Sequence, residues 1–544
     1  MLGLMQDWPL TLDKVLDHAA RVHGTREVVT RRTDGKLYRT TYAAIHARAR
    51  QVSNALLRAG IRLGDRVGTL GWNSERHLEC WYGTMGIGAV LHTLNPRLHA
   101  DQLAWIINHA ENRVVIFDTT FLPLVEAVAD KVKVEKWVVI ADPDQMPANK
   151  INALCYEEWI AGESGDVSWG QFDERTAAGL CYTSGTTGDP KGVLYSHRSN
   201  FLQMLMSMGT DCIGISAHDV VLPVVPMFHA NAWGLAFAGP ASGASLVMPG
   251  AQLDGASVYE LLDGEKVTIS AAVPTVWLGL LQHLEANGLK LPHLKRVVIG
   301  GSAVPERVLR AFEVDYGVEV YHAWGMTEMS PMGTIGRVPA ALKDAPLDVQ
   351  LAQKLKQGIP PSGVELKVVG EDGAELPRDG ESSGRLLVRG MAIVGSYFRK
   401  DDGTGKAALD ADGWFDTGDV ATIDQYGTMK ITDRTKDVIK SGGEWISSID
   451  LENAALLHPA VANAAAIGIP HPKWDERPLL VIERKPGASV SAAEIKAFLD
   501  GKIAKWWMPD AVVFIDAIPL GATGKNNKLK LREMHAAGEL NEAA

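Results

Sequence analysis

Short runs of apolar, often branched residues alternate along this chain with longer stretches in which apolar residues recur at helical spacing. Runs without apolar/polar alternation are typical of strands buried on both faces, and they occur at 113–118, 136–142 and 295–301. A helix is predicted where apolar residues fall at spacings of four, three and four, namely Ile45, Ala49, Val52 and Leu56. Gly60 is expected to end that helix. This alternation predicts an α/β fold with mostly parallel sheets flanked by helices.

The pattern changes after about residue 360, where Gly- and Asp-rich turns separate short alternating segments. Such segments predict a small β-rich subdomain over about 360–435. Beyond it we expect helices from Ser448 and Ala492 and strands over 461–469 and 478–483. We therefore predict an N-terminal domain over 1–435 and a small, mobile α+β C-terminal domain over 436–544.

Composition narrows the classes of function. The chain has 544 residues, 46% of them hydrophobic, which is enough for several packed cores. Its net charge of -11 argues against broad binding to nucleic acid or to an anionic membrane. The longest apolar region, around 220–250, is interrupted by prolines and polar residues, so no membrane span is expected. Cysteines without CxxC spacing and a start without signal-peptide features make the cytoplasm the expected compartment.

Residues 182–192, Tyr-Thr-Ser-Gly-Thr-Thr-Gly-Asp-Pro-Lys-Gly, concentrate the groups that hold a polyphosphate. Glycines let backbone N–H groups face phosphate oxygens, hydroxyl side chains add donors, and Lys191 supplies positive charge. A Walker A loop has Gly-Lys followed by Ser or Thr, whereas here the lysine precedes the glycine. The alternative is a Gly/Thr surface turn, which explains the density of hydroxyls poorly. The loop therefore points to ATP chemistry outside the P-loop class.

Further segments follow in order. Residues 321–328, Tyr-His-Ala-Trp-Gly-Met-Thr-Glu, combine aromatic rings, a hydroxyl and a carboxylate, which suit an adenine, a phosphate and a magnesium ion. Asp419 ends a Gly-rich turn and could accept hydrogen bonds from ribose hydroxyls, with Arg434 nearby in sequence. A turn aspartate more often caps backbone N–H groups, so this signal is weak alone. Lys525, in Thr-Gly-Lys, could carry an ammonium group into a site formed elsewhere.

Taken together, these segments resemble the adenylate-forming superfamily of acyl-CoA synthetases, luciferases and nonribosomal adenylation domains, over nearly the whole chain. The resemblance implies an ATP-dependent acid:CoA ligase that works through an acyl-adenylate and releases AMP and pyrophosphate. It also implies a C-terminal domain that swings about a hinge at Lys436. ATP, Mg²⁺ and coenzyme A are the implied cofactors. A homodimer is the expected assembly.

The resemblance places functional roles on particular residues. Lys525 is the implied catalytic lysine, assisted by Lys191, His229 and Glu328, and Thr186 with Glu328 would hold the metal. Nucleotide and CoA contacts fall on Thr183, Ser184, Gly185, Thr186, Thr187, Gly188, Lys191, Gly301, Ser302, Ala303, His322, Ala323, Trp324, Gly325, Met326, Thr327, Asp419, Arg434, Lys436, Gly442, Gly443 and Glu444. The tail departs from the usual pattern at Gly521, where a hydroxyl residue is common, and at Asn526, where a branched apolar residue is common.

The acid is expected to lie against residues 226–234, Pro-Met-Phe-His-Ala-Asn-Ala-Trp-Gly. This segment has no carboxylate to pair with a substrate ammonium, which argues against amino-acid activation. His229 would orient the acid, and Trp233 with Gly300 would wall the pocket; a packed aromatic core is the alternative. Residues 72–79 and 92–98 are similar to bacterial medium-chain fatty acyl-CoA ligases and 3-methylmercaptopropionyl-CoA ligases. We expect a medium-chain or short thioether acid; the alternatives are a carrier-loading adenylation enzyme and a CoA ligase specific for 3-methylmercaptopropionate.

Overall fold

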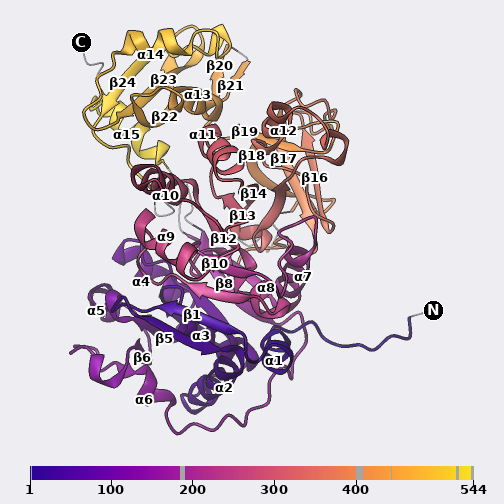
Figure 1. Cartoon of the computed structure of the whole chain (residues 1–544), viewed down its shortest axis with the longest axis vertical. Helices are drawn as coiled ribbons and strands as arrows, with labels where there is room; N and C mark the ends of the chain where they lie inside the picture. Colours follow the sequence, from indigo (N-terminus) through magenta and orange to yellow (C-terminus); the bar gives the residue numbers. More distant parts are fainter. Residues whose placement is uncertain (2, 184–189, 400–408, 443, 522–525, 541–544) are drawn as a thin grey trace.

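The computed structural model of the chain describes residues 1, 3–183, 190–399, 409–442, 444–521 and 526–540. Within these residues the strands form four sheets (Figure 1). The two large sheets lie in the lower and middle parts of the molecule in this view, and the segment beyond residue 436 forms a separate lobe above α10 and α11. This arrangement confirms the predicted α/β class.

The first large sheet has eight strands, and its six central strands run parallel. In spatial order they are β15 (Met332–Gly336), β14 (Glu319–Gly325), β13 (Arg296–Gly300), β12 (Ile269–Ala272), β10 (Val220–Pro223), β11 (Ser245–Met248), β1 (Glu27–Arg31) and β2 (Leu37–Thr41). Both edge strands, β15 and β2, are antiparallel to their neighbours. The central strands have few exposed residues, as sheets covered on both faces require.

The second large sheet has seven strands, of which β9 alone runs antiparallel. The order is β7 (Leu154–Cys155), β6 (Lys136–Ile140), β5 (Asn112–Asp118), β3 (Arg66–Leu70), β4 (Val90–Thr93), β8 (Ala177–Thr183) and β9 (Lys191–Ser196). The strands predicted at 113–118, 136–142 and 295–301 are thus β5, β6 and β13, with ends shifted by one or two residues.

Helices cover the faces of the two large sheets. They are α1 (Asp13–Val22), α2 (Tyr42–Arg58), α3 (Glu75–Gly86), α4 (Ala100–His109), α5 (Leu122–Ala129), α6 (Tyr156–Ile160), α7 (His197–Met208), α8 (Leu235–Ser242), α9 (Gly255–Gly264), α10 (Pro274–Asn287), α11 (Glu306–Arg310) and α12 (Leu347–Lys354). In α2, the predicted apolar set Ile45, Ala49, Val52 and Leu56 is buried. Gly60 follows with φ of 86°, a conformation that glycine adopts at no steric cost. Among the described residues, no helix is both long enough and apolar enough to cross a bilayer.

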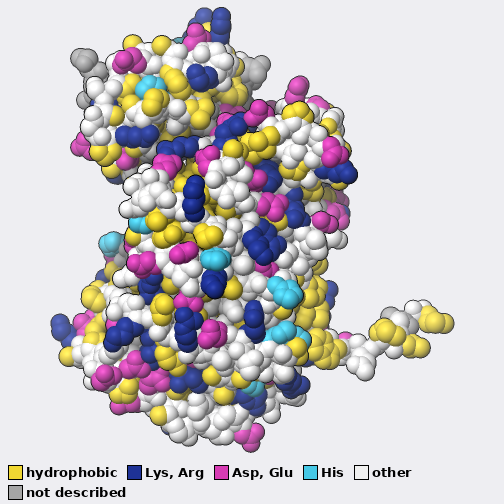
Figure 2. Space-filling view, viewed as in Figure 1, with side chains coloured by type: hydrophobic (Ala, Val, Ile, Leu, Met, Phe, Trp, Pro, Cys, Tyr) yellow, Lys and Arg dark blue, Asp and Glu magenta, His cyan; other side chains and the backbone are white. Residues whose placement is uncertain are grey.

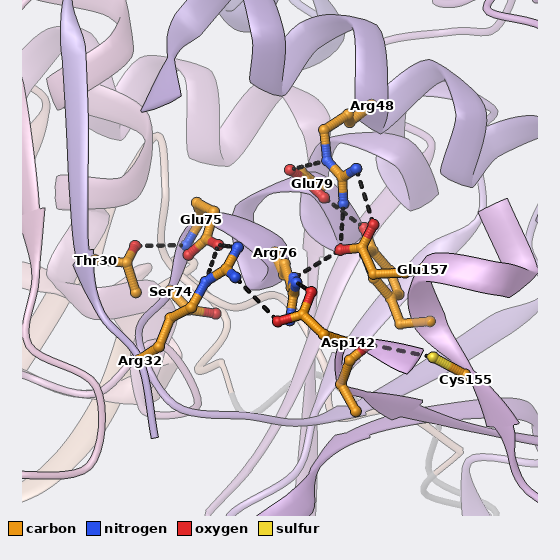
Figure 3. Close-up of polar contacts among 12 residues, drawn as sticks. Thr30, Arg32, Arg48, Ser74, Glu75, Arg76, Glu79, Asp142, Cys155 and Glu157 are labelled. Atoms are coloured by element: carbon orange, nitrogen blue, oxygen red, sulfur yellow. Dashed lines mark hydrogen bonds and ion pairs between the residues drawn. The ribbon is translucent and has the colours of Figure 1, made fainter. Parts of the chain in front are cut away.

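Helix α3 is buried along its whole length, although it carries charged residues. Its charges are neutralised by arginines and carboxylates from neighbouring elements (Figure 3). The ion pairs are Arg32–Glu75 at 2.7 Å, Arg48–Glu79 at 2.7 Å, Arg76–Glu157 at 2.8 Å, Arg48–Glu157 at 2.8 Å and Arg76–Asp142. Because a buried charge is tolerated only when it is paired, this network ties α3 to α2, to α6 and to the segments that follow β1 and β6.

The remaining strands form two smaller sheets. The four-stranded sheet is β16 (Val364–Val369), β17 (Gly384–Gly390), β18 (Phe415–Ile423) and β19 (Met429–Arg434), all antiparallel. The C-terminal sheet contains β21 (Glu444–Ile446), β20 (Ile439–Ser441), β23 (Asp475–Arg484), β22 (Val461–His471) and β24 (Ala511–Ile515), packed with α13 (Ser448–Leu456), α14 (Ala492–Leu499) and α15 (Lys528–Ala536). These are the β-rich subdomain and the α+β unit that the sequence predicts. The boundary at 435/436 and the mobility of the C-terminal unit stay predictions.

Candidate active site

The predicted phosphate loop connects β8 to β9 at the edge of the seven-stranded sheet. Thr183 ends β8 and pairs with Lys191, the first residue of β9. The residues between them include Ser184, Gly185, Thr186, Thr187 and Gly188, which lie outside the described residues. Thr183 and Lys191 thus mark the two ends of the predicted phosphate loop, at the carboxyl end of β8, where open α/β sheets bind ligands.

Lys191 and Glu328 both contact Tyr397. The Lys191 ammonium is 5.0 Å from the centroid of the Tyr397 ring. The Tyr397 hydroxyl donates a 2.8 Å hydrogen bond to Glu328 Oε1. Glu328 is 5% exposed, and burial raises the pKa of its carboxyl. A cation and a carboxylate therefore contact the same tyrosine beside the predicted phosphate loop.

The environment of Glu328 fits a magnesium ion that accompanies a nucleotide. Among the described side chains, no group of three or more His, Cys, Asp or Glu is placed to hold a metal by itself. Magnesium bound with phosphates needs only one or two protein oxygens, because water and phosphate complete its shell. A carboxyl whose pKa is raised by burial is suited to this role, since a cation restores its charged form.

The segment 322–327 comprises the last four residues of β14 and the two residues that follow, and it offers its main chain more than its side chains. His322 is buried, its Nδ1 is 3.0 Å from the Leu355 carbonyl, and burial lowers its pKa to about 4. Ala323, Gly325 and Met326 keep exposed surface. Any contact of His322 with a nucleotide would therefore come from its backbone.

Thr327 is fixed by a residue from β9. The Tyr195 hydroxyl donates a 2.8 Å hydrogen bond to the Thr327 carbonyl. The Val394 N–H donates a 2.8 Å hydrogen bond to the Glu328 carbonyl. The first bond holds Thr327 against β9, and the second ties Glu328 to the segment that precedes Tyr397.

Asp419 joins two of the predicted nucleotide segments. The Trp324 indole N–H donates a 2.9 Å hydrogen bond to Asp419 Oδ2. Arg434 Nε lies 2.7 Å from Asp419 Oδ1. The sequence pairs Asp419 with Arg434 as ribose contacts, and the structure brings these two side chains together in β18 and β19.

Gly300 and Trp233 face each other at the end of β13. A Cβ on Gly300 would lie 3.3 Å from Trp233 Cη2 and 2.8 Å from the Ala323 carbonyl oxygen. Trp233 is 9% exposed and packs in the same core cluster as α8. After Gly300 the chain turns through Gly301, with φ of 86°, into Ser302 and Ala303. Glycine at 300 thus leaves room for the indole beside β14.

The turn that carries Trp233 is left-handed. Ala230, Asn231, Ala232, Trp233 and Gly234 have φ values of 45°, 58°, 51°, 54° and 80°. For residues other than glycine this conformation costs about 1–2 kcal/mol each in conformational energy. Strain of this kind persists where the surroundings enforce it, and it concentrates at functional sites. His229, half-buried, lies directly before the turn.

Contacts with β19 join the C-terminal unit to the four-stranded sheet. Lys430 in β19 pairs with Asp450 in α13 at 2.9 Å. The Ser448 N–H donates a 2.6 Å hydrogen bond to Asp433 Oδ2, and burial raises the pKa of Asp433 to about 6. Lys436, the predicted hinge, is exposed, and its carbonyl accepts a hydrogen bond from Arg532.

The predicted CoA face lies on the β20–β21 hairpin. Gly442 has φ of 62°, and a Cβ there would approach Trp474 to 2.9 Å. Glu444 begins β21 opposite Ser441. Gly443 and the predicted catalytic Lys525 lie outside the described residues.

The unusual Asn526 has a polar partner. Its amide donates a 2.9 Å hydrogen bond to the Ala464 carbonyl and pairs with the Asn463 amide at 3.0 Å. Asn526, which directly follows the predicted catalytic Lys525 in the sequence, thus has polar partners in β22.

Sequence reasoning missed Tyr195 and Tyr397, which hold the Thr327–Glu328 turn. Tyr397 is 69 residues from Glu328, and Tyr195 is 132 residues from Thr327. No local pattern marks a tyrosine whose partner is so distant. One feature of the sequence hints at a role for Tyr195 in the site: it lies four residues after Lys191, in the same short strand.

Comparisons with known proteins place the chain among enzymes that handle adenylates. Residues 16–398 match the model of the AMP-binding enzyme family, and residues 450–525 match that of the AMP-binding enzyme C-terminal domain. A 3-methylmercaptopropionyl-CoA ligase of Ruegeria lacuscaerulensis is 52% identical, covering 98% of each chain. A medium-chain-fatty-acid–CoA ligase of Ectopseudomonas oleovorans is 46% identical, again over 98% of each. The crystal structure of the anthranilate CoA ligase AuaEII with anthranoyl-AMP has a TM-score of 0.87 at 27% identity, covering 98% of this chain and 100% of that one.

Proposed function

The chain belongs to the AMP-binding enzyme family, and from this premise we propose that it joins a carboxylic acid to CoA with ATP, through an acyl-AMP intermediate. The observation that carries the proposal is the meeting of Lys191, Tyr397 and Glu328 beside the phosphate loop. A cation for phosphate and a carboxylate for its metal lie at one edge of the sheet. The two relatives named above at 52% and 46% identity are CoA ligases of a thioether acid and of medium-chain fatty acids.

In the first step the acid carboxylate attacks the α-phosphorus of ATP, and pyrophosphate leaves. A carboxylate is a poor electrophile, so this step gives the acyl carbon a good leaving group, AMP. Positioning and charge neutralisation govern it, because both reactants are anionic. Lys191 and Lys525 supply positive charge to the phosphates and the acid, and His229 orients the carboxylate.

Asp419 and Arg434 hold the ribose, and the main chain of 323–326 lies along the adenine. The bond from Trp324 to Asp419 keeps these two parts of the nucleotide site together. Glu328 and Thr186 would hold a magnesium ion. When bound, that ion screens the triphosphate charge.

In the second step the CoA thiol attacks the acyl carbonyl and AMP leaves. We assign this step to a second orientation of the C-terminal unit, reached by rotation at Lys436, in which Gly442, Gly443 and Glu444 face the thiol. The contacts Lys430–Asp450 and Ser448–Asp433 would break in that rotation. The two orientations allow one acyl site to serve two reactions.

The acid is a fatty acid of medium chain or a short thioether acid. Residues 226–234 carry no charged group, and the Trp233 indole closes against Gly300. A closed, apolar wall favours a small or unbranched chain without an ammonium group. Identity of about half with a 3-methylmercaptopropionyl-CoA ligase supports the thioether acid in particular.

We propose a homodimer in which the first ten residues contact the partner. In Figures 1 and 2 the start of this arm stands clear of the body, whereas its end is docked: Trp8 packs edge-on against Phe201, and the Leu10 N–H donates a 2.8 Å hydrogen bond to Glu174. Leu4 is 92% exposed and Trp8 is 53% exposed. Apolar side chains on an extended arm are stabilised by burial against another surface, and a second copy supplies one in a symmetric pair.

We place the enzyme in a reducing compartment, the cytoplasm. The support is its four cysteines, Cys80, Cys155, Cys181 and Cys212, which are all buried and free. Buried free thiols are typical of chains that do not rely on disulfides.

A single assay tests the activity. ATP and Mg²⁺ are mixed with acids that include octanoate, 3-methylmercaptopropionate, anthranilate and an amino acid, with and without CoA. We expect multiple turnovers of AMP release only with CoA, and only with the fatty or thioether acids. AMP release that requires a phosphopantetheine-bearing carrier protein and ignores CoA would establish the carrier-loading alternative instead.

A further inference from the structure

The side chain of Asn73 binds the main chain of the segment that enters the acid pocket. Its amide nitrogen donates hydrogen bonds to the Pro223 carbonyl at 2.7 Å and to the Val225 carbonyl at 2.9 Å. The Met227 N–H donates a 2.7 Å hydrogen bond to Asn73 Oδ1. Asn73 is 3% exposed, so these bonds are shielded from water.

The chemistry of these three bonds requires an amide. Because two carbonyls accept and one N–H donates, the amide nitrogen of Asn73 must face the carbonyls and its oxygen must face the N–H. A carboxylate would place oxygen lone pairs against the carbonyls of Pro223 and Val225. An apolar side chain would leave three buried backbone groups unpaired, which is costly.

Asn73 is itself firmly anchored. It lies on the turn between β3, in the seven-stranded sheet, and α3, and its carbonyl accepts a 3.2 Å hydrogen bond from the Gly250 N–H. The two residues that follow Ser74 on α3, Glu75 and Arg76, are tied by ion pairs to Arg32 and Asp142 (Figure 3). The side chain of Asn73 therefore connects one large sheet to the end of β10 in the other.

The segment that Asn73 holds leads into the left-handed turn 230–234. At the far end of that turn, a Cβ on Gly234 would lie 2.3 Å from Gln203 Oε1, so α7 packs closely against it. A strained turn needs fixed positions at both of its ends, because otherwise the chain relaxes to right-handed conformations. Asn73 fixes the start, at 223–227, and α7 fixes the end.

We infer that Asn73 is a positioning residue for the acid: through the main chain of 223–227 it sets where His229 and Trp233 stand in the pocket. This inference rests on the proposed function of that pocket. Asn73 itself does not touch the acid. Its loss should therefore change how the acid is bound and aligned while the nucleotide half of the site keeps its properties.

The test uses Asn73→Asp, which keeps the acceptor for Met227 and removes both donors. Hydrogen exchange followed by mass spectrometry reads the segment 223–236 directly. We expect exchange there to become at least ~10-fold faster, because local opening is less costly. In the kinetic arm, kcat/KM for the acid should fall ~10- to 100-fold and the chain-length profile should change, since small misplacements are that costly. KM for ATP should stay within about twofold, because the nucleotide contacts are unchanged.

The matched control is Val52→Ala, which loosens the packing of α2 on α3 but leaves Asn73 intact. It should lower thermal stability with the same acid profile and the same exchange at 223–236. Unchanged exchange at 223–236 in folded Asn73→Asp overturns the inference. So does a loss of kcat/KM that is equal for the acid and for ATP in both Asn73→Asp and Val52→Ala. If Asn73→Asp does not fold, Asn73→Ser is read by the same criteria. A native enzyme inactive on every acid would sink the proposed function, and the exchange arm would still decide whether Asn73 holds the segment.

Discussion

The tip of the Trp233 indole stands 3.3 Å from the point where Gly300 would carry a side chain, so the indole occupies space that the absence of a side chain at 300 leaves open. Trp233→Ala should open that space and move the preference toward longer acids. Each buried methylene contributes about 0.8 kcal/mol, so two or three added carbons shift relative kcat/KM by about tenfold or more. The measurement is kcat/KM for linear acids from propionate upward.

Phe237→Leu serves as the control for Trp233→Ala, because Phe237 is buried in the same core cluster. Loss of packing alone should lower activity on all acids alike in both variants. Parallel chain-length profiles for the native enzyme and Trp233→Ala would show that Trp233 is only scaffold.

Lys525→Ala should remove most adenylation. The ammonium group is expected to stabilise developing charge on the acid and α-phosphate, an effect of about 2 to 4 kcal/mol in the transition state. Thioester formation from premade acyl-adenylate should survive, because that step does not need this lysine. Exposed Lys502, whose ammonium binds the Phe498 carbonyl, gives the control Lys502→Ala. Adenylate formed at the native rate in Lys525→Ala would refute the assignment.

Lys436→Pro should separate the two half-reactions. Proline fixes φ near −65° and so prevents rotation at this residue. Adenylation should persist while transfer to CoA stalls, as measured by rapid quench of each half-reaction. Lys436→Ala removes the side chain but keeps the rotation, and it should retain both steps. Equal loss of both steps in folded Lys436→Pro would argue against a hinge here.

Glu328→Gln should raise the concentration of Mg²⁺ needed for half-maximal adenylation, because a neutral amide is a weaker ligand for a hard cation. Tyr397→Phe removes the 2.8 Å hydrogen bond but leaves the carboxylate, so it should affect the Mg²⁺ requirement much less. The reading is initial rate against Mg²⁺ at fixed ATP. The same Mg²⁺ curve for native enzyme and Glu328→Gln would remove Glu328 from the metal site.

Asp433 should make stability depend on pH. Burial raises its pKa to about 6, against 3.8 for an ordinary aspartate. The folded protein then binds a proton more tightly than the unfolded chain does, so stability should fall as pH rises from about 4 to about 6 and level off above. The full effect is at most about 3 kcal/mol.

Asp433→Asn removes that titration while keeping an acceptor for the Ser448 N–H. The variant should lose this part of the decline in Tm between pH 4.5 and 6.5. Asp437→Asn, which changes a carboxylate paired with Arg532, is the control. Identical Tm profiles for native protein and Asp433→Asn would contradict the burial argument.

Local pattern was sufficient for the elements but not for the contacts between them. The strand at 113–118 and the helix around Ile45 follow from apolar periodicity, because the spacing of apolar residues along the chain shows which of them share a buried face. The left-handed turn at 230–234 could not be predicted, since alanine and tryptophan have no preference for that conformation. The bond from Asn73 to Met227 spans 154 residues, and only the assembled sheets bring the two together.

The pairing of Asn526 with Asn463 has a consequence for recombining this chain with its relatives. A chimaera that takes its last segment from a homologue with a branched apolar residue at 526 leaves the Asn463 amide facing hydrocarbon in β22. Exchanging residue 463 together with 526 preserves a matched pair. The two positions therefore form a natural unit of exchange, and a crossover placed between them should yield proteins that express less well than one placed before β22.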